Sequence, residues 1–340
     1  ALAAARPQGD RMLRRRRVVV AGHDLKFTGP LTEELRRAGA EVRQDVWTGH
    51  GGHDVAASRE LLGWAEAVWA EWCLGSAVWY AANRREDQRL VVRLHRQELT
   101  TDFPGQVDQR AVDRLVPVAP FVAREAIDRF AWDPARVEVV PNTIDMLPFD
   151  RPKLPGSERT LGMIGVLPAL KRLDRALDLL ELLLDDDPSW QLRLAGALPW
   201  DAPWVWARLT ERLFFREQLD RIRTSRRLAR AVRFEGRVAN IPGWLAGIGT
   251  ILSVSDLESF HLALAEGMAS RAVPVVLARE GVEELFPGTP IHDEVPAAAA
   301  WLTTLTAAER AEIGEAARAT VVDRYDLTVV GHRWVELLLG

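Results

Sequence analysis

The chain has 340 residues, of which 48% are hydrophobic and 27% charged, values that predict a globular protein with two domains. Its net charge is only -4 and its arginines alternate with acidic residues, so the composition argues against a nucleic-acid partner. Cys73 is the only cysteine, which excludes an internal disulfide and fits a reducing compartment.

The N-terminal segment, residues 1–16, is expected to form a disordered or extended arm. Its arginines, from Arg14 onward, follow a short Ala-rich stretch, whereas a secretory signal places the charge before a longer apolar run. No apolar stretch approaches the roughly 20 residues that cross a bilayer. We therefore expect a cytoplasmic protein, with contact to the inner face of a membrane left open.

The first half of the chain alternates between strand and helix patterns. Short apolar runs predict strands at 17–21, 41–46, 67–70, 90–94, 114–118 and 137–140, and helices are predicted from Pro30 to Gly39 and over 120–130. Such alternation indicates a parallel sheet covered on both faces. We assign 17–150 to a first domain.

A proline-rich linker follows, with Pro141, Pro148, Pro152 and Pro155 in one polar stretch. The alternation then restarts, with strands predicted at 160–165, 190–195, 232–234, 250–253 and 273–277. Helices are predicted over 173–184, 259–270 and most of 307–340. We assign 151–325 to a second domain and 326–340 to a C-terminal helix that packs back on the first. Two doubly wound α/β domains of this kind, each Rossmann-like, would face a central cleft.

The segment 253–269 carries the strongest chemical signal. Ser255, Asp256 and Ser259 are N-cap residue types, which predicts a helix that starts there, with Glu258 at its mouth and Glu266 two turns inside. Eight helical residues rise roughly 12 Å, so both carboxylates would edge one cleft at different depths. Carboxylates bind neighbouring hydroxyls, and helix N-termini bind phosphate. The alternative is an amphipathic helix with two solvated glutamates, against which the apolar neighbours of Glu266 argue.

This segment resembles a known family. Glu258, seven residues, Glu266 and then the strand Pro274-Val275-Val276 are similar to the donor-site signature of retaining GT-B glycosyltransferases of family 4. Further similarities lie at 139–145, 165–172, 192–196 and 232–238. The resemblance implies transfer of a sugar from a nucleotide-diphosphate sugar to an acceptor hydroxyl with retention of configuration. It also implies no cofactor and no metal, and it suggests cell-surface polysaccharide or glycoconjugate synthesis.

The resemblance also implies roles for individual residues. Glu258 would bind hydroxyls of the transferred sugar, Glu266 the ribose, and Lys171 the donor diphosphate, where a cation stabilises the charge of the leaving group. The other donor-side candidates are Arg172, Ser259, Phe260, His261 and Gly29. His95, at the end of the strand 90–94, would lie near the transferred sugar, although a lone histidine is more often structural. Glu71 and Trp72 occupy a similar strand end and are candidates for the acceptor side.

The chain departs from the family pattern at three positions. Val166 stands where an arginine is usual, His261 where glycine is commonest, and Arg271 where glycine is expected, so a positive φ there would strain the backbone. These departures leave open a catalytically inactive subunit that binds a nucleotide sugar. A GT-B sugar-nucleotide epimerase is a second alternative, which the departures do not bear on.

Two remaining features receive structural interpretations. The loop 50–54, with His50 and His53, lacks the further ligands that a metal site needs. The aromatic stretch 199–223, which includes Trp200 and Trp204, is expected to pack on the second sheet, with a membrane or partner contact as the alternative.

Overall fold

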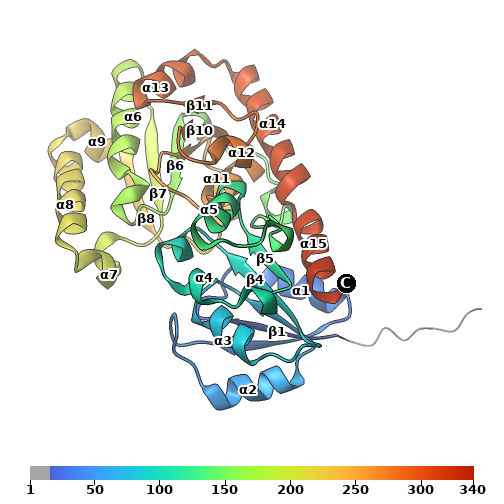
Figure 1. Ribbon diagram of the computed structural model, residues 1–340. Coiled ribbons are helices and arrows are strands. Elements are labelled where there is room, and N and C mark those ends of the chain that lie inside the picture. The colour runs from blue at the N-terminus through green and yellow to red at the C-terminus, as the bar shows by residue number, and fades with distance from the viewer. Residues whose placement is uncertain (1–15) are drawn as a thin grey trace, which may run out of the picture. The chain divides into compact units, whose positions relative to one another are not determined.

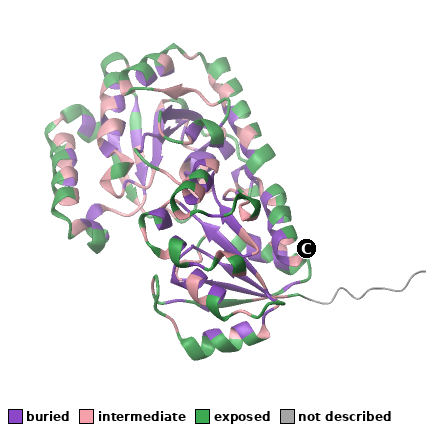
Figure 2. Cartoon of the chain, viewed as in Figure 1, coloured by how far each residue is buried: buried purple, intermediate pink, exposed green. Residues whose placement is uncertain are grey.

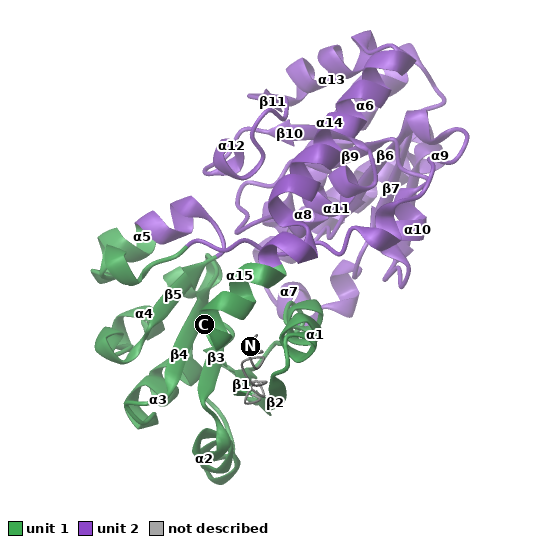
Figure 3. Ribbon diagram, turned by 90° about the vertical axis from the view of Figure 1, so that its right-hand side faces the viewer, with its two compact units in different colours: residues 1–117, 125–138, 331–340 green, residues 118–124, 139–330 purple. Residues whose placement is uncertain are grey.

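The computed structural model describes residues 16–340 (Figure 1), so almost all of the predicted N-terminal arm lies outside the described residues. The chain divides into two compact units (Figure 3). The first unit contains the chain up to Pro117, Glu125–Glu138 and Gly331–Gly340, and the second contains Val118–Arg124 and Val139–Val330. Residues 139–150 thus belong with the second unit, and the chain returns to the first unit for its last ten residues.

The first unit is built on a parallel sheet with strand order β2-β1-β3-β4-β5. The strands are β1 (Arg17–Gly22), β2 (Glu41–Val46), β3 (Ala67–Ala70), β4 (Arg89–Leu94) and β5 (Arg114–Pro117). In register, Val18 of β1 lies between Val42 of β2 and Ala67 of β3. The helices are α1 (Gly29–Arg37), α2 (Val55–Trp64), α3 (Gly75–Asn83) and α4 (Phe103–Gln106), together with α5 (Pro120–Phe130) and α15 (Leu327–Leu339), which both span the division between the units.

The strand predicted at 137–140 does not form. Val137 makes only an isolated bridge to Leu115, and the Glu138 amide donates to the Leu115 carbonyl oxygen at 2.9 Å. The chain then leaves the sheet ahead of Pro141, whose ring nitrogen cannot donate a ladder hydrogen bond. Apolar residues alone therefore did not distinguish a strand from a crossing segment.

Helix α15 completes the core of the first unit. Its Trp334 stacks on Trp69 of β3 with 4.1 Å between the ring centroids, and both side chains are fully buried. The guanidinium of Arg93, on β4, lies 5.3 Å from the Trp334 ring, within the range of a cation–π contact. Figure 2 shows β3 and β4 buried and the outer surface of α2 exposed.

The second unit contains a six-stranded parallel sheet of order β11-β10-β9-β6-β7-β8. The strands are β6 (Thr160–Ile164), β7 (Gln191–Ala195), β8 (Val232–Gly236), β9 (Thr250–Ser253), β10 (Val273–Leu277) and β11 (Ile291–His292). Its helices are α6 (Leu173–Asp186), α7 (Pro203–Trp206), α8 (Leu209–Thr224), α9 (Arg226–Ala231), α10 (Ile241–Leu245), α11 (Leu262–Ala269), α12 (Val282–Leu285), α13 (Val295–Thr304) and α14 (Ala307–Tyr325). The two parallel sheets confirm the predicted α/β class.

The aromatic stretch 199–223 is only partly buried. Phe215 on α8 is fully buried against the core, whereas Trp200 and Trp204 are about half exposed at 50% and 56%. Packing thus accounts for part of the stretch and leaves two tryptophans on the surface. Among residues 16–340, no helix combines the length and apolarity needed to cross a membrane.

Candidate functional site

The carboxyl ends of three adjacent strands position the predicted donor residues. Strands β6, β9 and β10 end at Ile164, Ser253 and Leu277, and each is followed by a polar loop. Because parallel strands end at the same edge of a sheet, these loops meet there, which is where ligands bind in open α/β folds. We call this place the second carboxyl edge.

The helix after β9 begins later than predicted. It starts at Leu262, and His261 occupies its N-cap position with φ of 70° and no side-chain capping bond. Of the predicted capping residues, Asp256 is engaged elsewhere: its amide donates to the Leu170 carbonyl oxygen at 2.9 Å, and its carboxylate binds Arg172. Glu258 therefore lies in the loop before α11, and only Glu266 lies on the helix.

Glu258 and Lys171 form an ion pair with 2.6 Å between Nζ and Oε1. Lys171 ends the short 3-10 turn Ala169–Lys171, whose first amide donates to the Glu211 carboxylate on α8 at 2.8 Å. Burial opposes the charge of Glu258, but its interactions with His261 and Lys171 outweigh burial and lower its pKa to about 2. Glu258 is consequently ionised at neutral pH.

The imidazole of His261 lies against Glu258. Its Nδ1 is 2.7 Å from the Ser253 hydroxyl and its Nε2 is 3.4 Å from Oε1 of Glu258. Burial lowers the pKa of His261 to about 3, so the ring is neutral at pH 7. His261 departs from the family pattern, yet it lies beside Glu258 in the segment between β9 and α11 that was predicted to bind the donor.

Glu266 lies on α11 with its carboxylate mostly buried. Burial raises its pKa to about 7. Across residues 16–340 its carboxylate has no hydrogen bond or ion pair. The helix lies tightly on β9, because a Cβ on Gly267 would come within 2.4 Å of Ile251. Glu266 thus lies on a tightly packed helix, and its carboxylate oxygens remain available to a ligand.

The other predicted donor residues have different surroundings. Arg172 has a left-handed backbone and binds Asp174 at 2.7 Å and Asp256 at 2.9 Å. Phe260 is buried in the core, where its ring packs on Phe286 and Tyr325. Ser259 lies between Glu258 and Phe260 in the same loop.

Arg279 was missed by the sequence analysis. It lies two residues after β10, and its Nη1 donates to the carbonyl oxygens of Ser253 at 3.3 Å and Leu277 at 3.4 Å. Its Nη2 is 3.4 Å from Nδ1 of His261. Burial lowers the pKa of its guanidinium to about 10, with Glu258 acting in the opposite direction. The sequence did offer one signal for Arg279: a positively charged residue that closely follows a predicted strand, where ligand-binding loops lie.

The structure also shows what surrounds the two other residues that depart from the family pattern. Val166 is buried in the hydrophobic core of the second unit. Arg271 does have a positive φ, 65°, and its guanidinium binds Glu315 at 2.6 Å and Asp150 at 3.1 Å. These two ion pairs lie on the surface and offset part of the backbone strain.

The carboxyl edge of the first sheet, the first carboxyl edge, places His95 among aromatic rings. The His95 ring centroid lies 4.1 Å from that of Trp72 and 5.5 Å from that of Phe27. Its Nδ1 is 3.5 Å from Glu98, which also accepts the His95 amide at 2.9 Å. Gly29 begins α1 and has open space where a Cβ would lie.

A buried ion pair stands beside His95. Glu71, directly after β3, lies 3.5 Å from Arg93, and both side chains are fully buried. Burial raises the pKa of Glu71, while Arg93 acts in the opposite direction. The Glu71 carboxylate is also 3.9 Å from Nε2 of His95.

The loop 50–54 has a structural role in this edge. His53 stacks on Trp47 at 3.7 Å, and its Nδ1 lies 2.7 Å from the Ser58 hydroxyl. Asp54 caps α2 by accepting the amides of Ala56 and Ala57. Within residues 16–340, no group of three or more His, Cys, Asp and Glu side chains is placed to hold a metal ion.

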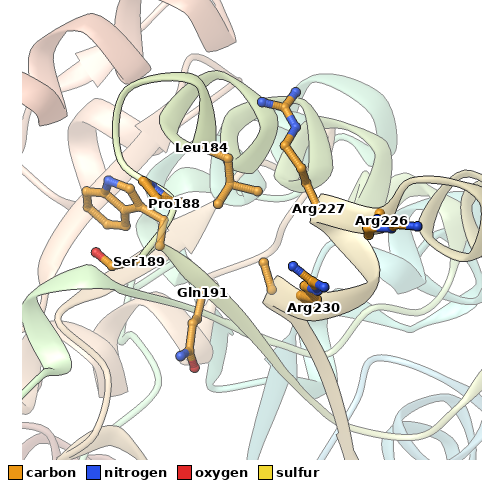
Figure 4. A pocket seen from close by; sticks show the side chains of 9 residues that line it. Leu184, Pro188, Ser189, Gln191, Arg226, Arg227 and Arg230 are labelled. Atoms are coloured by element: carbon orange, nitrogen blue, oxygen red, sulfur yellow. The ribbon is translucent and has the colours of Figure 1, made fainter.

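A cavity of about 360 Å³ lies at the amino end of β7, away from the carboxyl edge of its own sheet (Figure 4). Arg226, Arg227 and Arg230 of α9 line it, opposite Pro188 and Trp190. Arg227 binds Asp185 at 2.5 Å, and its side chain points out of the cavity in Figure 4. The position of this cavity therefore does not correspond to the predicted donor site.

Most of the second unit matches the model of a known protein family. Residues 158–305 match the family model described as Glycosyl transferases group 1. This segment contains Lys171, Glu258, Glu266 and Arg279. No curated protein sequence matches the chain.

Solved structures give the fold of the whole chain. Anabaena HepE in complex with UDP and glucose is 16% identical with a TM-score of 0.68, and the alignment covers 95% of this chain and 99% of HepE. Sucrose-phosphate synthase from Thermosynechococcus elongatus is 15% identical with a TM-score of 0.70, over 95% and 98% of the two chains. S. aureus TarM is 15% identical with a TM-score of 0.63, over 79% of this chain, which spans about half, 55%, of the TarM chain. The predicted GT-B fold is thereby confirmed.

Proposed function

We propose that the protein is a glycosyltransferase that moves a sugar from a nucleotide-diphosphate sugar to an acceptor hydroxyl with retention of configuration. The match of residues 158–305 to Glycosyl transferases group 1 and the GT-B fold support the class of reaction. The second carboxyl edge supports the assignment of the donor to the second unit.

Glu266 carries the proposal. A mostly buried carboxylate without a protein partner is costly, and two neighbouring hydroxyls of a ribose would supply the missing hydrogen bonds. Glu266 lies on the first helix after β9, at the edge where α/β folds bind nucleotides. We assign Glu266 to the ribose of the donor.

Glu258 and Lys171 would act at the other end of the donor. Glu258 stays ionised and can accept hydroxyls of the transferred sugar, while Lys171 at 2.6 Å supplies a positive charge to the same place. As the glycosidic bond breaks, negative charge grows on the departing diphosphate, and a fixed cation stabilises it. In this proposal the departing phosphate takes the acceptor proton, and no enzymic nucleophile is involved.

The first carboxyl edge is proposed to serve the acceptor side. His95 and Trp72 form an aromatic surface there, and Gly29 leaves open space at the start of α1. We further propose a cytoplasmic protein that needs no bound metal and acts in cell-surface polysaccharide or glycoconjugate synthesis.

The test begins with a thermal-shift screen of nucleotide sugars, including UDP-glucose because HepE was solved with UDP and glucose. Calorimetry then compares the wild type with Glu266→Ala, which should abolish donor binding, and with Glu312→Ala, an exposed glutamate on α14 that serves as the matched control. Full turnover by Glu266→Ala would contradict the assignment. Proton NMR of the product reports retention directly, and product analysis without acceptor identifies an epimerase.

His261 favours a second candidate, a subunit that binds a nucleotide sugar without transferring it. Its imidazole already lies 3.4 Å from the carboxylate oxygen of Glu258 that Lys171 binds. That oxygen therefore has two protein neighbours before any sugar arrives. Donor binding without transfer or hydrolysis, followed by gain of turnover in His261→Gly, would support this candidate.

A further inference from the structure

Four cationic side chains gather at the second carboxyl edge, but only three have a carboxylate partner. Lys171 binds Glu258 at 2.6 Å. Arg172 binds Asp174 at 2.7 Å and shares Asp256 with Arg175, each at 2.9 Å. The three carboxylates that bind these cations, Glu258, Asp174 and Asp256, form no ion pair with the fourth cation.

Arg279 is the remaining cation. Within residues 16–340 no carboxylate oxygen lies within 4.0 Å of its guanidinium. Its neighbours are the two carbonyl oxygens of Ser253 and Leu277 and the ring nitrogen of His261, which burial keeps neutral. A largely buried guanidinium is costly unless an anion compensates it.

We infer that Arg279 is the main protein anchor for the diphosphate of the nucleotide-sugar donor. This inference rests on the proposed function and assigns to Arg279 the larger share of a role that the resemblance gives to Lys171. Lys171 and the neighbouring Arg172 already form ion pairs with protein carboxylates, whereas Arg279 forms none within residues 16–340 and feels Glu258 only from beyond 4.0 Å.

The chemistry of the side chain fits a phosphate. A guanidinium offers parallel N–H donors that match two phosphate oxygens, and such charge-assisted pairs are strong. Carbonyl bonds from two strand ends fix Nη1 of Arg279, so little side-chain freedom is lost on binding. Lys171, at the adjacent strand end, would contact the same diphosphate only while keeping its bond to Glu258.

The experiment distinguishes the contribution of the ligand's diphosphate to binding from the contribution of its nucleoside. Calorimetry measures binding of inorganic pyrophosphate, of the nucleoside diphosphate that the wild type binds best, and of the matching nucleoside. The variants are Arg279→Met, Arg279→Lys, Arg172→Met and, as an exposed matched control on α8, Arg216→Met.

We expect Arg279→Met to lose about 10-fold to 100-fold in affinity for the nucleoside diphosphate, because a hydrogen bond to a charged group is removed. Affinity for the nucleoside should not change. Arg279→Lys should recover part of the loss, since it keeps the charge without the fork. Arg172→Met should lose less than Arg279→Met, and Arg216→Met should match the wild type.

Two results would overturn the inference while leaving the proposed function intact. One is a folded Arg279→Met that binds the diphosphate as tightly as the wild type. The other is an equal loss for nucleoside and diphosphate, which would indicate a merely structural role. If Arg279→Met does not melt cooperatively, Arg279→Lys replaces it as the test. Wild-type affinity for the nucleoside diphosphate in Arg279→Lys would contradict a role for the parallel guanidinium donors. A wild type that binds no nucleoside diphosphate or nucleotide sugar would overturn the proposed function itself.

Discussion

The two carboxyl edges of the molecule occupy the same place in their sheets but use charge differently. At the first edge, Glu98 accepts the amides of Cys73 and His95, and Glu71 lies against Arg93, with all three charged side chains fully buried. At the second edge, Glu266 has no partner among the described residues and Arg279 has no carboxylate. Equivalent positions in a repeated architecture therefore do not imply equivalent function. At the first edge the buried charges of Glu71 and Arg93 pair with each other, although the Glu71 oxygens have no hydrogen-bond partner. At the second edge Glu266 and Arg279 form no ion pair within residues 16–340 and leave their charges for a ligand.

The largest expected effect breaks the first unit while sparing the second edge. Trp334→Ala removes a fully buried ring that stacks on Trp69 and covers Arg93, and should cost about 3–5 kcal/mol in the free energy of unfolding. Urea denaturation measures this cost, with Trp204→Ala as a control because that ring is 56% exposed. Nucleoside diphosphate affinity of the folded variant should equal that of the wild type. If the folded Trp334→Ala lost affinity for the nucleoside diphosphate, ligand binding would not depend on the second edge alone, contrary to the comparison above.

The next effect concerns the ion pair at the second edge. Lys171→Met should lower kcat about 100-fold to 1,000-fold, because the developing charge on the diphosphate loses a fixed cation. Steady-state kinetics at saturating acceptor would measure it, with Arg216→Met as the control for removal of a positive charge.

The same variant also has a stability signature. Glu258 would remain mostly buried without its cation, so Lys171→Met should destabilise the fold, and adding Glu258→Gln should recover part of the lost stability. Strictly additive losses in this double-mutant cycle would contradict the described pairing.

Sequence reasoning located the strands better than the side-chain contacts. The strands at 67–70, 250–253 and 273–277 were predicted at their observed bounds because they are buried on both faces and consist mainly of apolar residues. The start of α11 was misplaced because Asp256 has capping chemistry but binds Leu170 and Arg172 instead of the helix. Helix α8 was not predicted, since its apolar residues mix with arginines and acidic residues on most sides.

The pairing of charges at the site could not be read from the sequence. Arg279 and Lys171 are separated by more than a hundred residues, and only the strand order β10-β9-β6 brings their loops to one edge. Which carboxylate neutralises which cation depends on distances of a few ångströms. Glu258 and Glu266 were found because their spacing resembles a known signature, whereas Arg279 belongs to no pattern that the analysis used.

The smallest effect depends on pH and sharpens the contrast at Glu266. Its folded pKa of about 7 exceeds the ordinary value of 4.5, so the folded protein holds this proton more tightly than the unfolded chain. The associated stability is present below pH 4.5 and is lost as the pH rises through 7. Glu266→Gln should therefore match the wild type near pH 4.5 and be more stable by up to about 3 kcal/mol at pH 8.

Thermal or urea melts across this pH range measure the difference between the two proteins. Glu312→Gln, at an exposed position, should show no such pH-dependent gap. A gap that stays constant from pH 4.5 to pH 8 would mean that Glu266 titrates as an ordinary surface carboxyl, and the argument for an available buried carboxylate would fail.

The return of residues 331–340 to the first unit has a consequence for synthesis on the ribosome. The five strands of that unit all precede residue 118, yet the tryptophan that covers β3 and β4 is residue 334 and is translated after the whole of the second unit's sheet. During that interval, Trp69 and Arg93 lack the ring that buries them. The first unit is consequently completed only after the second unit has been translated, and a nascent chain stalled before residue 331 would expose an incomplete core to chaperones and proteases.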